Sequence, residues 1–319
     1  MKELKIFGIV AVFTLILYWG VEPFAHSQMH KHVDGHGFTY DGTADIAEAN
    51  AAENKDKVVA KKAFWADVAK VSKLTGDVAA GEAGFATCMG CHMEGGVNMG
   101  GVIPPVLDHA GALYDKNYLI ALIKDPAMAS NVDHKYADTM THPMGSIKAM
   151  MVDDQQIADV VAYIMAKKAG EVTTKEAFTE ACGRCHAMRY AKTTQLGDTP
   201  KFKHEKDALA HKIKVLDEQA LVKAYMGKLP PDLSMIIRAR SAHFLETFVE
   251  NPQSQLPGTS MPRVGLTHEG YEKVKAYMTE IGDPSKPARE ELGPKVLLFF
   301  IIFTGLAFLW KKSRWKGHY

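Results

Sequence analysis

Apolar residues form an uninterrupted run near each end of the chain, whereas the middle alternates apolar and polar positions. One run covers residues 6–21, and the other covers residues 296–310 and is followed at once by several basic residues. A transmembrane helix needs about 20 mostly apolar residues, and flanking Trp and Lys side chains can extend a shorter run into the interface. The pattern predicts transmembrane helices at 1–24 and 292–312 and a basic tail at 313–319.

Each run has an alternative interpretation. The first resembles a signal peptide, but Val21-Glu22-Pro23-Phe24-Ala25 lacks the small-residue pattern that signal peptidase requires, so we expect a retained anchor. The second resembles a buried core helix, but core helices rarely end in a dense cationic cluster. Because basic residues stay on the cytoplasmic side, both termini are predicted to be cytoplasmic. The residues between the runs then lie in the periplasm of a bacterium, outside its inner membrane.

The middle of the chain contains the same order of parts twice. A helical stretch is followed by an amphipathic helix that stops at Pro126 in one copy and at Pro252 in the other. A loop with Met beside Pro and a terminal amphipathic helix complete each copy. The sequence therefore predicts two small helical domains. Their boundaries are 75–170 and 171–284, after a connector at 25–74 that contains a helix at 47–73.

Composition is that of an ordinary folded protein. The chain has 319 residues, 47% hydrophobic and 24% charged, with a formal net charge of +1. Disorder is therefore not expected. A balanced charge also gives no indication of a nucleic-acid partner.

All four cysteines fall in two pentapeptides, Cys88-Met89-Gly90-Cys91-His92 and Cys182-Gly183-Arg184-Cys185-His186. A disulfide framework would scatter its cysteines, and neither a thioredoxin-like pair nor a four-cysteine zinc site explains a histidine after each pair. The Cys-x-x-Cys-His pattern is typical of covalent haem c attachment. The sequence predicts two haems, held by thioethers to Cys88, Cys91, Cys182 and Cys185, with His92 and His186 as proximal iron ligands.

The distal iron ligands are predicted from the Met-bearing loops. Met261 is the candidate in the second domain. In the first domain Met144 is favoured by its spacing before the terminal helix, and Met140 is the alternative; Met150 and Met151 are expected to begin that helix as core residues, and His109, His134 and His142 are lesser alternatives. A haem iron with His and Met ligands has no open position, which suits electron transfer rather than bond-making. The predicted fold class is mainly α, with two cytochrome c-like helical domains between two transmembrane helices.

The second domain resembles cytochrome c1, the haem c subunit of the quinol:cytochrome c oxidoreductase (bc1) complex. Residues 230–234 read Pro-Pro-Asp-Leu-Ser and residues 185–188 read Cys-His-Ala-Met, both similar to segments of that family, and a C-terminal anchor with a basic tail is a further shared feature. The first domain has no counterpart in the usual single-haem cytochrome c1, and the overall arrangement resembles the dihaem cytochrome c1 type of some bacteria, including the epsilon group. Arg238 and Arg240 follow the Pro-Pro segment and are candidate contacts to haem propionates, with exposed surface charge as the alternative.

This resemblance implies a non-catalytic electron-transfer subunit with a cytochrome b subunit, a Rieske iron–sulfur protein and membrane lipid as partners, in a complex that is generally dimeric. The second haem would accept electrons from the Rieske protein. The first haem, as a hypothesis, passes them to a soluble cytochrome c or a terminal oxidase. Two alternatives remain: the dihaem subunit of a cbb3-type oxidase, whose anchor is N-terminal, and a dihaem peroxidase, which needs an iron without a strong distal ligand.

Overall fold

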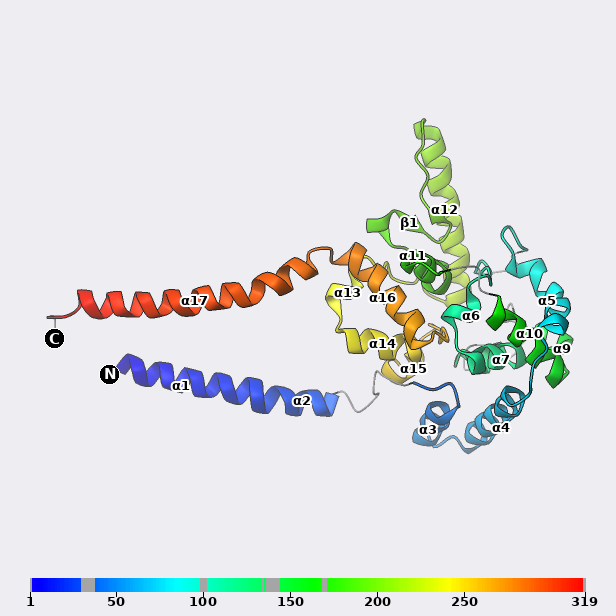
Figure 1. The fold of residues 1–319 in the computed structure, drawn as a ribbon, viewed down its shortest axis with the longest axis horizontal. Helices are drawn as coiled ribbons and strands as arrows, with labels where there is room; N and C mark the ends of the chain where they lie inside the picture. The colour runs from blue at the N-terminus through cyan, green and yellow to red at the C-terminus, as the bar shows by residue number, and fades with distance from the viewer. Residues whose placement is uncertain are drawn as a thin grey trace.

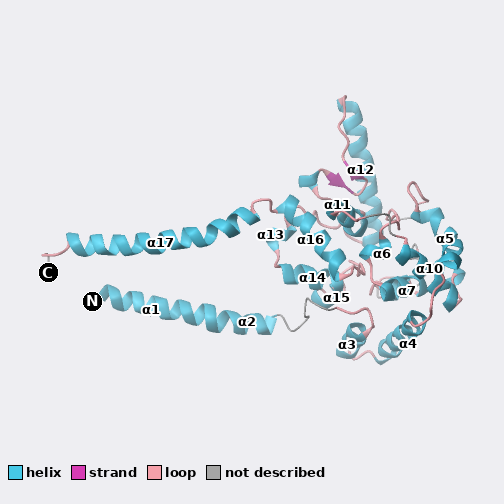
Figure 2. Cartoon of the chain, viewed as in Figure 1, coloured by secondary structure: helices cyan, strands magenta, loops and turns pink. Residues whose placement is uncertain are grey.

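The computed structural model describes residues 2–29, 38–97, 102–133, 135, 144–167 and 171–317. Helices dominate it, and the predicted fold class is confirmed (Figure 2). Figure 1 shows a body of short helices from which two long helices extend together, so that both chain ends lie at the same side.

The first helical domain is built around two crossing helices, α5 (Val78–His92) and α10 (Asp154–Ala166). They approach so closely that a Cβ at Gly81 would lie 2.0 Å from the carbonyl oxygen of Asp159, which explains the glycine there. Short helices complete the domain: α6 (Ala110–Leu113), α7 (Lys116–Lys124), α8 (Pro126–Ala129) and α9 (Ile147–Met150). Met151 is buried as expected, but the expectation for Met150 was wrong, because it ends α9 with its side chain exposed.

The second domain repeats the crossing with α11 (Thr174–Phe178) and α16 (His268–Gly282), where the rings of Phe178 and Tyr277 lie 5.1 Å apart. A π-helical turn, η3 (Thr179–Gly183), continues α11 into the second motif. The remaining elements follow in chain order: η4 (Arg189–Ala191), the antiparallel pair β1 (Thr193–Thr194) and β2 (Gly197–Asp198), α12 (Glu205–Met226), α13 (Ile236–Ala239), α14 (Ala242–Glu250) and α15 (Pro252–Gln255).

The connector corrects the sequence analysis. A single helix at 47–73 was expected, but the structure has α3 (Thr43–Ala51) and α4 (Lys55–Ser72). The chain turns at Glu53, whose φ of 52° is left-handed, and the Asn54 side chain then accepts a hydrogen bond from the Lys57 amide to cap α4. Helix propensity alone did not reveal this break, because neither Pro nor Gly marks it.

A buried ion pair joins the connector to the second domain. The Arg263 and Asp45 side chains are each 1% exposed, and Arg263 Nη2 lies 2.5 Å from Asp45 Oδ1. Trp65 of α4 donates from Nε1 to Asp45 Oδ2 at 2.9 Å. The Arg263 amide also donates to the Ser130 carbonyl of the first domain at 2.9 Å. Arg263 therefore binds the connector and both domains at one point.

The two domains share one hydrophobic core. The Asp115 amide donates to the Gly265 carbonyl, and the Thr267 amide donates to the Leu113 carbonyl, so the segment after Arg263 pairs with the segment before α7. The Tyr118 hydroxyl donates to the Arg263 carbonyl at 2.8 Å. Because of these contacts, the two domains pack against each other as one unit.

The terminal helices agree with the predicted anchors but are longer. A continuous helical segment runs through α1 (Lys2–Ile16), the π turn η1 (Leu17–Val21) and α2 (Glu22–Met29), and α17 (Lys286–Arg314) closes the chain. Residues Lys2–Ala25 and Lys286–Arg314 are long and apolar enough to cross a membrane. An ion pair between Lys311 and Glu3 joins the two helices near the chain termini.

We expect Asp45→Asn to destabilise the full chain by ~3–5 kcal/mol, because it leaves the Arg263 guanidinium buried without its counter-charge. Chemical denaturation followed by circular dichroism in detergent measures this loss. Asp198→Asn is the matched control, since Asp198 pairs with Lys175 on the surface with both side chains at least 50% exposed. That change should cost no more than ~1 kcal/mol. Equal losses in the two variants would contradict the role given to the buried pair.

Candidate functional site

The first motif lies in the last turn of α5, which presents His92 to the loop that precedes α6. His92 Nδ1 lies 2.8 Å from the Pro105 carbonyl oxygen, so Nδ1 carries the hydrogen and donates it. The lone pair of Nε2 is then free to bind a metal, and Nε2 lies 3.3 Å from Met144 Sδ. Burial lowers the pKa of His92, which keeps the ring neutral as a ligand must be. An imidazole nitrogen and a thioether sulfur brought together in this way are donors that fit a haem iron.

The second motif begins in the π turn η3, which contains Cys182 and Gly183. The amides of Cys185 and His186 both donate to the Cys182 carbonyl, at 3.1 and 2.9 Å, and this holds the motif in one tight turn. His186 Nδ1 lies 2.8 Å from the Pro231 carbonyl oxygen. Burial lowers the pKa of His186 as well, so it too is neutral. A backbone carbonyl that fixes the tautomer of a ligating histidine is a common outer-shell partner.

The two histidines are held in the same way, a likeness that was not predicted from the sequence. In each case the acceptor is the carbonyl of the second proline in a Pro-Pro pair, Pro104-Pro105 after the first motif and Pro230-Pro231 after the second. The signal was present in the sequence, because each motif is followed by one such pair. The different separations from the motif, 13 residues and 45 residues, concealed the equivalence.

The Pro-Pro-Asp-Leu-Ser segment is fastened to the loop after the second motif. Asp232 accepts hydrogen bonds from the Arg189 amide and from the Ser234 amide, each at 3.0 Å. The Leu233 amide donates to the Ala187 carbonyl at 2.9 Å. These bonds hold Pro231 against His186, so the segment orients the histidine.

The four cysteines form no disulfide and lie in the same turns as their histidines. Burial raises the pKa of Cys182 to about 12 and also raises the pKa values of Cys88 and Cys185. These three thiols therefore lack the lowered pKa of a catalytic thiolate. Within the described residues no three His, Cys, Asp or Glu side chains form a metal-binding group.

The predicted distal ligands differ in their placement. Met144 faces His92, whereas Met140 lies outside the described residues, as do His134 and His142. His109 pairs with Glu180 at 2.6 Å. Met261 is half-buried, and its amide donates to Thr259 Oγ1 at 3.3 Å. No hydrogen bond joins Met261 to His186 in the part of the chain that the structure describes, so its ligation stays a prediction.

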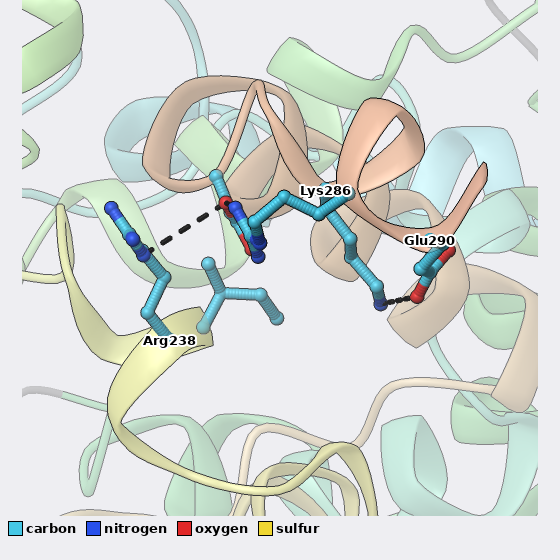
Figure 3. A pocket seen from close by; sticks show the side chains of 6 residues that line it. Arg238, Lys286 and Glu290 are labelled. Atoms are coloured by element: carbon cyan, nitrogen blue, oxygen red, sulfur yellow. Dashed lines mark hydrogen bonds and ion pairs between the residues drawn. The ribbon is translucent and has the colours of Figure 1, made fainter. Parts of the chain in front are cut away.

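The two candidate arginines already have partners in the protein. Arg238 Nε lies 3.8 Å from Asp283 Oδ1, at a pocket beside the start of α17 that Lys286 and Glu290 also line (Figure 3). The Arg240 guanidinium lies 5.5 Å from the centre of the Phe244 ring. Their contact with haem propionates therefore also stays a prediction.

Two buried carboxyl groups lie one turn apart on α14. Glu246 Oε1 lies 3.1 Å from His268 Nδ1, while Glu250 Oε2 is buried and has no hydrogen-bond partner among the residues that the structure describes. Burial, with the nearby charge of Glu246, raises the pKa of Glu250 to about 8. Glu250 is therefore protonated at neutral pH, and this acid belongs to the same domain as the second motif.

Comparison with known proteins gives three similarities. Residues 78–168 match the family model for cytochrome c. The ammonia monooxygenase gamma subunit of Nitrosomonas europaea is 30% identical to this chain, over 44% of this chain and 79% of that protein. A chain of a solved structure, the hyperthermophilic respiratory Complex III, is 25% identical and covers 45% of this chain and 74% of that chain, with a TM-score of 0.35. A TM-score this low does not establish a shared fold.

We expect Glu250→Gln to become progressively more stable than the wild type as pH rises from about 5 to about 8. In this range the unfolded chain releases the Glu250 proton while the folded chain retains it, so the wild type alone loses stability with rising pH. Melting temperatures across this pH range measure the difference. Glu272→Gln, at a carboxyl 42% exposed, is the control and should follow the wild type. A constant difference between wild type and Glu250→Gln would contradict the assignment.

Proposed function

This chain belongs to the family of the Nitrosomonas europaea protein and contains a cytochrome c domain with covalently bound haem c, and we propose that it is the dihaem, cytochrome c1-type subunit of a bacterial respiratory quinol:cytochrome c oxidoreductase. The proposed haem attachments are the four motif cysteines. The proposed iron ligands are His92 with Met144 and His186 with Met261. Haem c supplies one-electron redox chemistry, and the protein's residues hold and orient it.

The observation that carries this proposal is the position of the Pro-Pro-Asp-Leu-Ser segment. In the sequence it resembles cytochrome c1, and in the fold its Pro231 carbonyl binds the predicted iron ligand His186. The Pro105 carbonyl holds His92 in the same way, so this contact alone does not set the second domain apart. The second segment differs because Asp232 and Leu233 also bond to the loop that follows His186. The resemblance therefore involves the site itself, and it favours a cytochrome c1-like role for the second domain.

The proposed electron route runs from a Rieske iron–sulfur protein to the second haem, then to the first haem, and on to a soluble cytochrome c or a terminal oxidase. The proposed location is the inner membrane, with a cytochrome b subunit beside the two terminal helices. Both termini would be cytoplasmic, which is consistent with their lying at the same side in Figure 1 and with the Glu3–Lys311 ion pair. The haem domains would then lie in the periplasm.

A second candidate follows from the name of the Nitrosomonas relative, which describes a subunit of an ammonia monooxygenase. The same chain would then carry electrons in an oxygenase complex. Purification of the complex from the native membrane distinguishes the two, because the first candidate requires a cytochrome b and a Rieske protein as partners. Copper- or iron-containing oxygenase subunits in their place would support the second, and a haem–copper subunit would indicate an oxidase.

Removal of the first haem tests the route. In the double variant Cys88→Ala with Cys91→Ala, we expect quinol to reduce the second haem at the wild-type rate, while electron delivery to a soluble cytochrome c slows strongly. Stopped-flow spectroscopy on the purified complex measures both steps. Cys182→Ala with Cys185→Ala is the reciprocal control and should abolish both. Unchanged delivery without the first haem would refute its role as the outgoing carrier.

Replacement of Met144 tests the ligand assignment. We expect Met144→His to lower the potential of one haem by a large amount and to leave the other unchanged, because a Met ligand raises the haem potential relative to His. A redox titration of the full chain in detergent measures both potentials. Met150→His is the control, since Met150 is 57% exposed. If Met140→His lowers the potential and Met144→His does not, Met140 is the ligand.

A further inference from the structure

The two motifs meet where the loop before α6 packs on the turn that carries the second motif. Arg184, between Cys182 and Cys185, donates from Nη1 to the Ile103 carbonyl oxygen at 3.3 Å. Ile103 lies two residues before Pro105, whose carbonyl binds His92. Two residues of chain span at most about 7 Å. A side chain of the second motif and the predicted iron ligand of the first therefore bind the same short stretch of backbone.

A second contact fastens the other end of this loop. His109 Nδ1 lies 2.6 Å from Glu180 Oε1, and both side chains are about 85% buried, with exposures of 15% and 14%. Glu180 also lies in the turn η3, and its carbonyl accepts from Arg184 Nε at 3.2 Å. We call Ile103, His109, Glu180 and Arg184 the inter-motif seam. Arg184 and Glu180, which lie around the second pair of cysteines, therefore hold the loop before α6 at two points.

We propose that the inter-motif seam is the path by which an electron passes directly between the two haems, with Arg184 as the residue that positions one motif against the other. This inference rests on the proposed dihaem function and names its internal route. The step moves one electron: the donor iron changes from ferrous to ferric, the acceptor iron changes from ferric to ferrous, and no proton or bond is exchanged. Arg184 and Glu180 contribute by fixing the distance and orientation of the two haem-bearing turns.

The test uses the full chain with both haems in detergent. Rapid one-electron reduction by a photoexcited flavin is followed by absorbance, and direct transfer appears as a phase whose rate does not depend on protein concentration. We expect Arg184→Gln to slow this phase several-fold. We also expect faster amide hydrogen exchange in residues 102–113 of this variant, because the loop loses one of its two clamps. Arg184→Lys keeps the positive charge but lacks the forked guanidinium group, so it should give an intermediate rate.

Lys175→Gln is the matched control, because Lys175 lies on α11 with its side chain 50% exposed and pairs with Asp198 rather than with the loop. Glu180→Gln provides a second variant if Arg184→Gln does not fold. A wild-type rate in Arg184→Gln, or equal slowing in Lys175→Gln, would overturn the seam. The absence of any concentration-independent phase in the wild type would overturn the seam too. If quinol still reduced the second haem in that case, the proposed function would remain intact.

Discussion

The ion pair between Arg263 and Asp45 is the constraint on which the arrangement of this molecule depends. Burying two charges costs several kcal/mol for each ion, and the cost is offset only when geometry and additional hydrogen bonds are good. Here Arg263 makes two bonds to Asp45 and a further one from Nε to the Glu250 carbonyl, and Asp45 also accepts from Trp65. Each guanidinium nitrogen and each carboxylate oxygen of the pair therefore has a partner. Because these bonds join the connector to the second domain, and the Arg263 backbone also binds the first domain, the pair holds the three parts together.

This constraint reaches the haem sites through the chain itself. Arg263 lies two residues after Met261, so the loop that carries the predicted distal ligand is held at a buried point with little freedom to move. The Arg263 amide and carbonyl bind the first domain at Ser130 and Tyr118. The connector therefore acts as part of the second site as well as a link to the membrane. The same contacts fix the relative position of the two motifs and allow a seam between them.

Much of the fold could be predicted because its signals are local. The paired cysteines with histidine, the amphipathic helices that stop at proline and the two apolar runs each need only a few neighbouring residues, and the structure has helices at all these places. α12 was missed because its apolar residues do not form one stripe: Leu209 and Ile213 are exposed while Val222 is buried. The Pro105 and Pro231 carbonyls were missed because the two Pro-Pro pairs lie at different distances from their motifs, 13 and 45 residues after the histidines. Arg263 with Asp45 joins residues 218 positions apart, which one sequence cannot reveal.

The two motifs are alike in how their histidines are held and different in the segments that support them. The first motif ends a regular helix, α5, with Met144 in contact with His92. The second begins in a π turn, and a long insertion carrying α12 precedes the segment that holds its histidine. Single π turns inside helices are frequent at functional sites, because they shift side chains by one extra residue. Here η3 and the residue that follows it bring Glu180 and Arg184 into contact with the first domain. Among the described residues, no side-chain hydrogen bond from the first motif to the second domain is found. The second motif is therefore the one adapted to its neighbour, as expected if it serves as the fixed entry point and the first as a simpler carrier.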